Sequence, residues 1–301
     1  MATHGYASKE VEQTWTKALC LCEDLDDDVS LFRVLVGLGN YYLASGEVRR
    51  VALLNRRLAN IARRLRNSGM RIRARAAMGE LMLHLGRIDS SVRHFEACIS
   101  LFNEMDGTNF LGNSAVVLAH SHLAWARFHM GQESAALVHN EQALSTAHSS
   151  DKPILLAMAL GMSAKLHRFR DDPARAAKLA METIQIAEQQ RFTYWHGSAL
   201  VTLGWTQART GDTTKALSTI GRGFDLISVT GERLMQPMRL GALADAQRMH
   251  GLHTLATATL NQALELARST GERFCLRELR RVLQLLEGNT KTTKEGEYLN
   301  G

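Results

Sequence analysis

The chain has 301 residues, of which 45% are hydrophobic and 22% are charged, and its formal net charge is +6. This apolar content is enough to bury a core, and abundant Ala, Leu, Arg, Glu and Gln with only three prolines favour helices. The longest uncharged apolar run, residues 153–164, is much shorter than the roughly 20 residues of a membrane span, and residues 1–13 lack the order of a signal peptide. We therefore expect an all-helical soluble protein of the cytoplasm.

Turn residues recur along the chain with a nearly constant spacing. Glycine stands in the stretches SGE, LGR, MGQ, TGD and HGL, and aspartate takes the corresponding place in RDD. The positions are Gly46, Gly86, Gly131, Asp171, Gly211 and Gly251, with gaps of 40, 45, 40, 40 and 40 residues. Both residue types tolerate the backbone of a helix C-cap or tight turn. The spacing therefore predicts a repeated helical hairpin with this turn at its tip.

In chain order, we predict a leading helix over residues 8–25, six hairpins over residues 31–269 and a closing helix over residues 272–287. Small residues follow four of the turns by five positions, so the second helix of a hairpin can pack closely on the first: Ala136, Ala176, Ala216 and Ala256. Residues 1–288 are expected to form a single helical-repeat domain. The polar tail over residues 289–301 is expected to be disordered.

The tetrapeptide Thr-Gly-Glu-Arg occurs at residues 230–233 and again, forty positions later, at residues 270–273. Its Thr-Gly half is suited to end one helix, and its glutamate suits the N-terminus of the next. We therefore place it in the turns between consecutive hairpins. Pro153 and Pro173 fit first-turn positions of their helices, whereas Pro237 is expected to kink its helix or delay its start.

A helical hairpin cannot bury its apolar stripe alone, so neighbouring hairpins have to stack. The predicted fold is all-α: a right-handed superhelical solenoid of about six antiparallel helix pairs with capping helices and a period of about 40 residues. Leu38–Gly46 and the stretch TLGWTQARTGD are similar to tetratricopeptide repeats, although this period exceeds their usual length of about 34 residues.

Four longer stretches resemble, in order, the C-terminal repeat region of large bacterial signalling ATPases of the adenylate-cyclase-associated and maltose-regulon-activator-like type. They are GYASKEVEQTWTKALCLCEDL, GLGNYYLASGEVRRVALLNRRLANIARR, LGWTQARTGDTTKALSTIGRG and ATLNQALELARSTGERFCLRELRRVL. The similarity covers about residues 5–286. In that family the repeats are thought to receive a signal from a partner or small ligand and to restrain the ATPase, so the resemblance implies a regulatory role. The phosphate loop GxxxxGK[ST] is missing from the sequence, and no ATP hydrolysis is expected.

The strongest charge feature runs from Arg49 to Arg75, a stretch with ten arginines and no acidic residue, so the rest of the chain is net negative by about four. Six of these arginines are predicted to form a basic patch on an outer helix: Arg49, Arg50, Arg56, Arg57, Arg63 and Arg64. The alternatives are a solvated face neutralised by the neighbouring Glu23–Asp28 segment, a surface for an acidic partner, and a nucleic-acid surface. The last is least favoured, because base-reading aromatic or polar residues are missing among the cations.

The first helices of the hairpins are expected to line the concave surface of the solenoid. Alignment on the turn residues places these side chains there: Arg33, Asn40, Arg73, His84, Trp125, His129, Lys165, Arg168, Trp205, Arg209 and Arg248, with Glu80, Ser121 and Asp245 among them. Arginine and lysine bind carboxylates or phosphates through charge-assisted hydrogen bonds, and tryptophan supplies apolar contact area. We therefore predict a cationic ligand-binding groove, with internal pairing of Arg248 and Asp245 as the alternative.

Neither metal binding nor catalysis is expected from the sequence. His120 and His122 are two residues apart and point to different helix faces. His250 and His253 flank a turn and have no acidic or cysteine partner at ligand spacing. Four cysteines without metal or redox spacing are expected to be reduced: Cys20, Cys22, Cys98 and Cys275. No cofactor is implied, and no nucleophile–base arrangement can be recognised.

Three functions remain open at this point. The first is a non-enzymatic protein-interaction module that binds an acidic peptide or partner segment in the cationic groove. The second is a sensor for a small anionic metabolite or nucleotide that regulates a signalling ATPase. The third is nucleic-acid binding through the arginines of residues 49–75. No membrane partner is expected.

Overall fold

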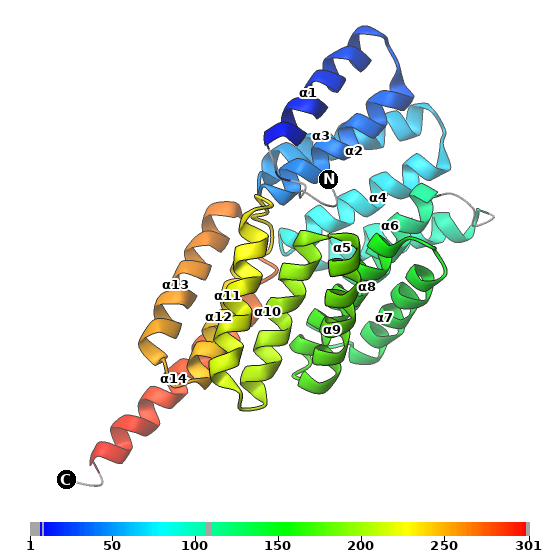
Figure 1. Cartoon of the computed structure of the whole chain (residues 1–301). Helices are drawn as coiled ribbons and strands as arrows, with labels where there is room; N and C mark the ends of the chain where they lie inside the picture. The colour runs from blue at the N-terminus through cyan, green and yellow to red at the C-terminus, as the bar shows by residue number, and fades with distance from the viewer. Residues whose placement is uncertain (1–6, 8, 106–109, 299–301) are drawn as a thin grey trace.

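The computed structural model describes residue 7 and residues 9–105 and 110–298. This part of the chain contains fourteen α-helices and no strand, which confirms the all-helical prediction. They are the leading helix α1 (Lys9–Asp24), the pairs α2 (Asp28–Ala44) and α3 (Val48–Arg64), α4 (Ser68–His84) and α5 (Ile88–Asn103), α6 (Phe110–His129) and α7 (Glu133–His148), α8 (Pro153–Phe169) and α9 (Pro173–Gln190), α10 (Thr193–Arg209) and α11 (Thr213–Ser228), α12 (Gln236–Met249) and α13 (His253–Thr270), and the closing helix α14 (Leu276–Tyr298). Neighbouring pairs pack in chain order, so the stack in Figure 1 is a solenoid of tetratricopeptide-like repeats. Within the described ranges, no helix combines the length and apolar character that crossing a bilayer requires.

The closing helix is longer than the sequence analysis expects. It begins at Leu276 and continues to Tyr298, whereas disorder is predicted from residue 289. Residues 289–298 contain no proline, so every residue there keeps the backbone N–H that a helix needs. Residues 299–301 of the predicted tail lie outside the described residues.

Each turn inside a pair contains one residue with left-handed backbone, as the forty-residue spacing predicts. The five turn glycines have φ angles between +71° and +95°, and Asp171, which replaces glycine in the fourth pair, has φ +56°. Left-handed residues also mark the turns between described helices of consecutive pairs and after α1: Asp26, Arg66, Asp151, Arg191, Gly231 and Gly271. The two Thr-Gly-Glu-Arg stretches therefore lie between pairs. The four alanines expected at close helix contacts are fully buried.

Local signals set where the helices start. The Asp27 side chain accepts hydrogen bonds from two first-turn N–H groups of α2, and Asn67 and Asp172 cap α4 and α9 in the same way. Pro153 occupies the first turn of α8, as predicted. Pro237 lies in the first turn of α12, so it delays the start of this helix rather than kinking it.

The turns after α11 and α13 continue further beyond their left-handed residue than the turns before α8 and α10. After Asp151 and Arg191 the next helix begins two residues later, but after Gly231 and Gly271 it begins five residues later. The extra backbone allows these two turns to extend away from their own pairs. Their sequence is the repeated Thr-Gly-Glu-Arg.

These two long turns contact the first two pairs and close the solenoid. The backbone N–H groups of residues 233 and 234 donate to the Ala44 carbonyl, at 2.7 and 3.0 Å. The N–H groups of residues 273 and 274 donate to the His84 carbonyl, at 2.8 and 3.4 Å. Because Ala44 and His84 end α2 and α4, their carbonyls have no partner inside their own helix. The same contact thus occurs twice. The two acceptor residues are forty positions apart in the sequence, and so are the two sets of donor residues.

One apolar core joins the two ends of the chain. It contains Ile72 and Phe95 from the second pair together with Leu240 from α12 and Phe274 from the last turn. Trp125, from the third pair, belongs to the same core. The interior of the superhelix is therefore filled by side chains from both halves of the sequence.

The closure predicts different effects for one substitution at two turn glycines. A Cβ at Gly86 (φ +71°) would lie 2.8 Å from the Cβ of Arg273, whereas a Cβ at Gly131 (φ +79°) would meet no heavy atom within 4 Å. Gly131→Ala should lower the free energy of unfolding by about 1–2 kcal/mol, the cost of a left-handed backbone for an L-residue. Gly86→Ala should cost a further ~1–3 kcal/mol, because the closing turn has to shift. Urea denaturation measures both values, and equal losses would contradict the contact with Arg273.

Candidate functional site

The eleven side chains predicted to line the concave groove lie on the first helices of the pairs, but most of them are closed to solvent. Six are buried, namely Arg73, His84, Trp125, Lys165, Arg168 and Trp205. Three are half-buried, namely Asn40, His129 and Arg248, and two are exposed, namely Arg33 and Arg209. The last between-pair turn and α14 cover this inner surface. A ligand can therefore reach Trp125 and Arg168 only if that covering segment moves.

A carboxylate of α14 occupies the cationic part of the groove. Arg168 on α8 donates to Glu278 on α14 at 3.0 Å, and both side chains are almost fully buried. Arg281, also on α14, donates to Glu278 at 3.0 Å and to Asp245 on α12 at 2.9 Å. Burial alone would raise the pKa of Glu278, yet Arg168 and Arg281 hold it below its usual value. The closing helix is thus attached to two inner helices by a buried ionic network.

Asp245 is the acceptor at the centre of this network. It accepts from the Trp205 indole at 3.0 Å and from the Arg248 guanidinium at 2.8 and 3.1 Å. Burial alone would raise the pKa of Asp245, but Arg281 and the hydrogen bonds from Trp205 and Arg248 hold it below its usual value. The internal Arg248–Asp245 pair is therefore present, and Trp205 serves as a hydrogen-bond donor inside the protein.

The other groove tryptophan packs against the last turn. Trp125 stacks on Phe274, with ring centroids 5.8 Å apart and planes 16° apart, and its indole donates to the Met162 carbonyl at 3.0 Å. The His129 imidazole lies perpendicular to the Phe274 ring, with ring centroids 4.5 Å apart. Phe274 thus takes the position that a ligand aromatic group would need in order to contact Trp125.

A second polar cluster lies where the two long turns face α8 and α12. Glu272 accepts from the backbone N–H of Met235 at 2.9 Å through one oxygen, and its other oxygen has no partner among the described residues. Burial raises the pKa of Glu232 and of Glu272 to about 7. Burial, assisted by the nearby charge of Arg239, lowers the pKa of Lys165 to about 7. The interior therefore holds acids and a base whose charges change near neutral pH.

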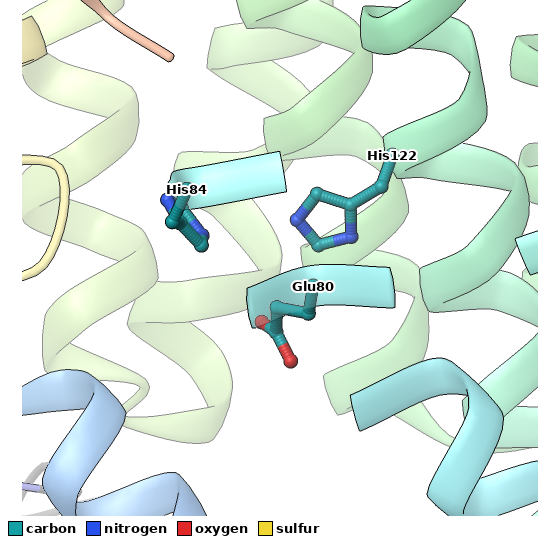
Figure 2. Close-up of side chains that lie close together, drawn as sticks. All are labelled: Glu80, His84 and His122. Atoms are coloured by element: carbon teal, nitrogen blue, oxygen red, sulfur yellow. The ribbon is translucent and has the colours of Figure 1, made fainter. Parts of the chain in front are cut away.

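Glu80, His84 and His122 converge in a place where the sequence analysis expects no metal ligands. Figure 2 shows the three side chains together, and their ligand atoms all lie within 4.8 Å of one another. Burial raises the pKa of Glu80 to about 7 and lowers the pKa of His84 to about 4 and of His122 to about 3. Both imidazoles are therefore neutral at pH 7. The four-residue spacing of Glu80 and His84 on α4 can be seen in the sequence, but the approach of His122 from α6 cannot.

The six arginines predicted as a basic patch lie on α3 and form two rows along the helix. The first row is paired, Arg57 with Glu23 at 2.6 Å, Arg64 with Asp28, and Arg50 with Glu12 and Glu47 at 3.5 and 3.1 Å. The Glu23–Asp28 segment thus neutralises Arg57 and Arg64, as the first alternative predicts, whereas Arg50 pairs outside that segment. The second row, Arg49, Arg56 and Arg63, is exposed and forms no ion pair within the described part of the chain.

An exposed leucine lies within the unpaired row. Leu53 is 61% exposed, and it lies between Arg49 and Arg56 on α3. Positions 49, 53, 56, 60 and 63 are alternately four and three residues apart, so they share one side of the helix. We call this surface the arginine face, consisting of Arg49, Leu53, Arg56, Asn60 and Arg63. It combines cations with an apolar side chain that nothing in the described structure covers.

No known protein family and no curated protein sequence matches the chain. Solved structures do match it. A Rap protein complexed with competence and sporulation factor has a TM-score of 0.61 at 14% identity, over 85% of this chain and 76% of that one. NprR in complex with its cognate peptide NprX has a TM-score of 0.60 at 13% identity, over 97% and 86%. BtubC from P. vanneervenii has a TM-score of 0.53 at 17% identity, over 73% and 89%. At these identities the likeness establishes the fold of this chain, a tetratricopeptide-like helical solenoid.

Proposed function

We propose that this chain is a non-enzymatic protein-interaction module that binds an acidic segment of a partner protein on the arginine face of α3. The observation that carries the proposal is the contrast between the two arginine rows. One row is neutralised inside the chain, and the other is exposed without acidic partners in the described residues. The Rap protein and NprR, which were solved with a factor and a cognate peptide bound, support peptide binding by a fold of this kind.

The arginine face specifies the chemistry of its partner. A guanidinium binds a carboxylate through two parallel hydrogen bonds, which gives orientation as well as energy. Residues seven apart on a helix lie about 10 Å apart, so carboxylates at the same repeat on a partner helix can meet Arg49, Arg56 and Arg63 in register. Leu53 then requires an apolar side chain between those carboxylates. The best partner is therefore an acidic amphipathic helix.

A charge-reversal experiment tests this surface. The probe is a labelled helical peptide with glutamates seven residues apart and leucines between them, titrated by fluorescence anisotropy. Arg56→Glu should weaken binding about tenfold, which corresponds to about 1.4 kcal/mol. Arg222→Glu, an equal charge change at an exposed site on α11, should leave the affinity unchanged. Equal weakening by both variants would mean that net charge alone attracts the peptide, and the arginine face would not be the site.

Nucleic acid is the other polyanion that this face could attract, and the same titration separates the two. Phosphate contacts lose affinity steeply as salt rises, because bound counterions are released. Labelled single-stranded and double-stranded DNA should bind more weakly than the acidic peptide at physiological salt. Tighter DNA binding that Arg56→Glu abolishes would replace the acidic protein partner by a nucleic acid.

The concave groove is a second candidate, favoured by the contact between Arg168 and Glu278. The groove already binds an acidic helix of its own chain, so a partner segment or a small anionic ligand would have to replace α14 there. Such replacement would make α14 a regulatory element, in agreement with the signalling role that the sequence resemblance implies. Arg277→Ala removes an exposed α14 contact to the His129 carbonyl and should strengthen binding of a peptide of residues 270–288. Arg280→Ala, exposed on the same helix, is the matched control.

A further inference from the structure

Glu80, His84 and His122 form a compact set of ligand atoms in the interior of the solenoid. Glu80 and His84 lie one turn apart on α4, and His122 enters from α6, the first helix of the next pair. Their carboxylate oxygen and imidazole nitrogens lie within 4.8 Å of one another (Figure 2). No other described group of at least three His, Cys, Asp or Glu residues has this geometry.

The His122 imidazole is held with one nitrogen available. Its Nδ1 lies 3.0 Å from the Leu118 carbonyl, so Nδ1 carries the proton and donates, and Nε2 keeps its lone pair. The ring stacks on Phe95 with centroids 5.5 Å apart and planes 4° apart, and it has edge contacts to Trp125 at 5.4 Å and to His84 at 6.1 Å. A backbone carbonyl that orients the imidazole is the usual outer partner of a metal-binding histidine.

The other two side chains have unused binding capacity. His84 is 2% exposed, and neither its imidazole nor the Glu80 carboxylate forms a hydrogen bond or ion pair in the described part of the structure. Buried polar groups are nearly always partnered, so the His84 imidazole beside the half-buried Glu80 carboxylate is suited to a ligand that the protein itself does not supply. A narrow cleft of about 10 Å³ beside Asn40 and Arg73 reaches Glu80, which is room for about one water molecule.

We propose that Glu80, His84 and His122 bind one divalent transition-metal ion of the Zn²⁺ type. Two imidazoles and one carboxylate are a ligand set that Zn²⁺ accepts, whereas Mg²⁺ and Ca²⁺ require oxygen ligands. A tetrahedral ion with bonds of about 2.0–2.2 Å needs its ligand atoms about 3.4 Å apart, so the present set has to contract slightly. Rotation of the Glu80 terminal torsion, which is broad in carboxylates, can shorten the distances from its oxygen to the two imidazole nitrogens.

The bound ion would join parts of the solenoid that are distant in sequence. His84 comes from the second pair and His122 from the third, and the His84 carbonyl also accepts the closing turn at residues 273 and 274. The ion would therefore fix α4 to α6 at the position where the superhelix closes. This site uses none of the residues of the arginine face, so it succeeds or fails independently of the proposed function.

Metal titration of the full chain tests the site. After chelation and removal of the chelator, Co²⁺ should give the visible bands of a low-coordinate site, and Zn²⁺ should displace it at one ion per chain. His84→Ala and His122→Ala should each weaken Zn²⁺ binding by at least about 100-fold, and Glu80→Gln, which keeps the side-chain shape, by about tenfold or more. Zn²⁺ should raise the Tm of the wild type but not of these variants.

The matched control uses two other histidines that lie close together. His120 and His139 place their Nδ1 atoms 3.1 Å apart between α6 and α7. His120→Gln should leave the Co²⁺ spectrum and the stoichiometry unchanged. Wild-type protein that binds neither Co²⁺ nor Zn²⁺, or that loses binding in His120→Gln but not in Glu80→Gln, would overturn the proposal.

Discussion

A chain that ends after Thr270 should fail to form a stable soluble monomer. Besides Cys275, the truncation removes four large buried side chains from the core, namely Phe274, Leu279, Val282 and Leu286. At about 1.5–3 kcal/mol for each buried side chain, the loss is of the order of 6–12 kcal/mol, which is comparable to the whole stability of an ordinary domain. It also uncovers Trp125 and leaves Arg168 without its carboxylate. Gel filtration and a thermal melt followed by circular dichroism measure the outcome.

The control for this truncation is a chain that ends after Gly288. It keeps every residue of α14 that the structure describes as buried, and it removes residues 289–301. This truncated protein should remain monomeric, and its Tm should be close to that of the wild type. If the chain that ends after Thr270 were soluble with an unchanged Tm, α14 would not cover the inner surface in solution.

Asp245→Ala should lower the free energy of unfolding by about 3–5 kcal/mol. The side chain is 1% exposed and accepts hydrogen bonds from Trp205, Arg248 and Arg281, so its removal leaves the buried Trp205 indole and the half-buried Arg248 guanidinium without their acceptor. Asp245→Asn, which keeps an acceptor oxygen but no charge, should cost less. Urea denaturation with tryptophan fluorescence reports both the stability and the environment of Trp205.

Asp225 provides the matched control for this substitution. It is exposed on α11, so Asp225→Ala should change the free energy of unfolding by no more than about 0.5 kcal/mol. A loss of similar size in Asp225→Ala and Asp245→Ala would show that the ionic network does not stabilise the fold.

The helix pairs could be predicted because their signals are local. A turn that needs left-handed backbone selects glycine or aspartate, so Gly86 and Asp171 mark equivalent positions without knowledge of the rest of the chain. The register of each helix on its partner follows from the apolar spacing within about fifteen residues. For the same reason the first helices could be assigned to the inner surface.

The accessibility of the inner surface could not be predicted. It depends on a small rotation between neighbouring pairs, which accumulates from the first pair to the turn after the fifth pair, where residue 233 meets Ala44. The spacing of Arg168 and Trp205 places them on the inner helices, but no local pattern shows that Glu278 and Asp245 bind them. The approach of His122 to Glu80 depends on the same accumulated geometry. Longer-range features of this kind follow from the superhelix and not from any single segment.

The contacts of the two Thr-Gly-Glu-Arg turns change the way in which this array can come apart. An open solenoid behaves as a one-dimensional chain of units, in which the terminal units have one neighbour and fray first. Here the Ala44 and His84 carbonyls give each of the first two pairs an additional neighbour from the far end of the sequence. The repeats are therefore connected like the units of a closed ring, and not like an open row with two free ends. Unfolding of one pair removes packing contacts from the neighbours on both of its sides. The amide hydrogens of α2 and α4 should therefore exchange at rates similar to those of α12 and α14, because these helices open together as one cooperative unit.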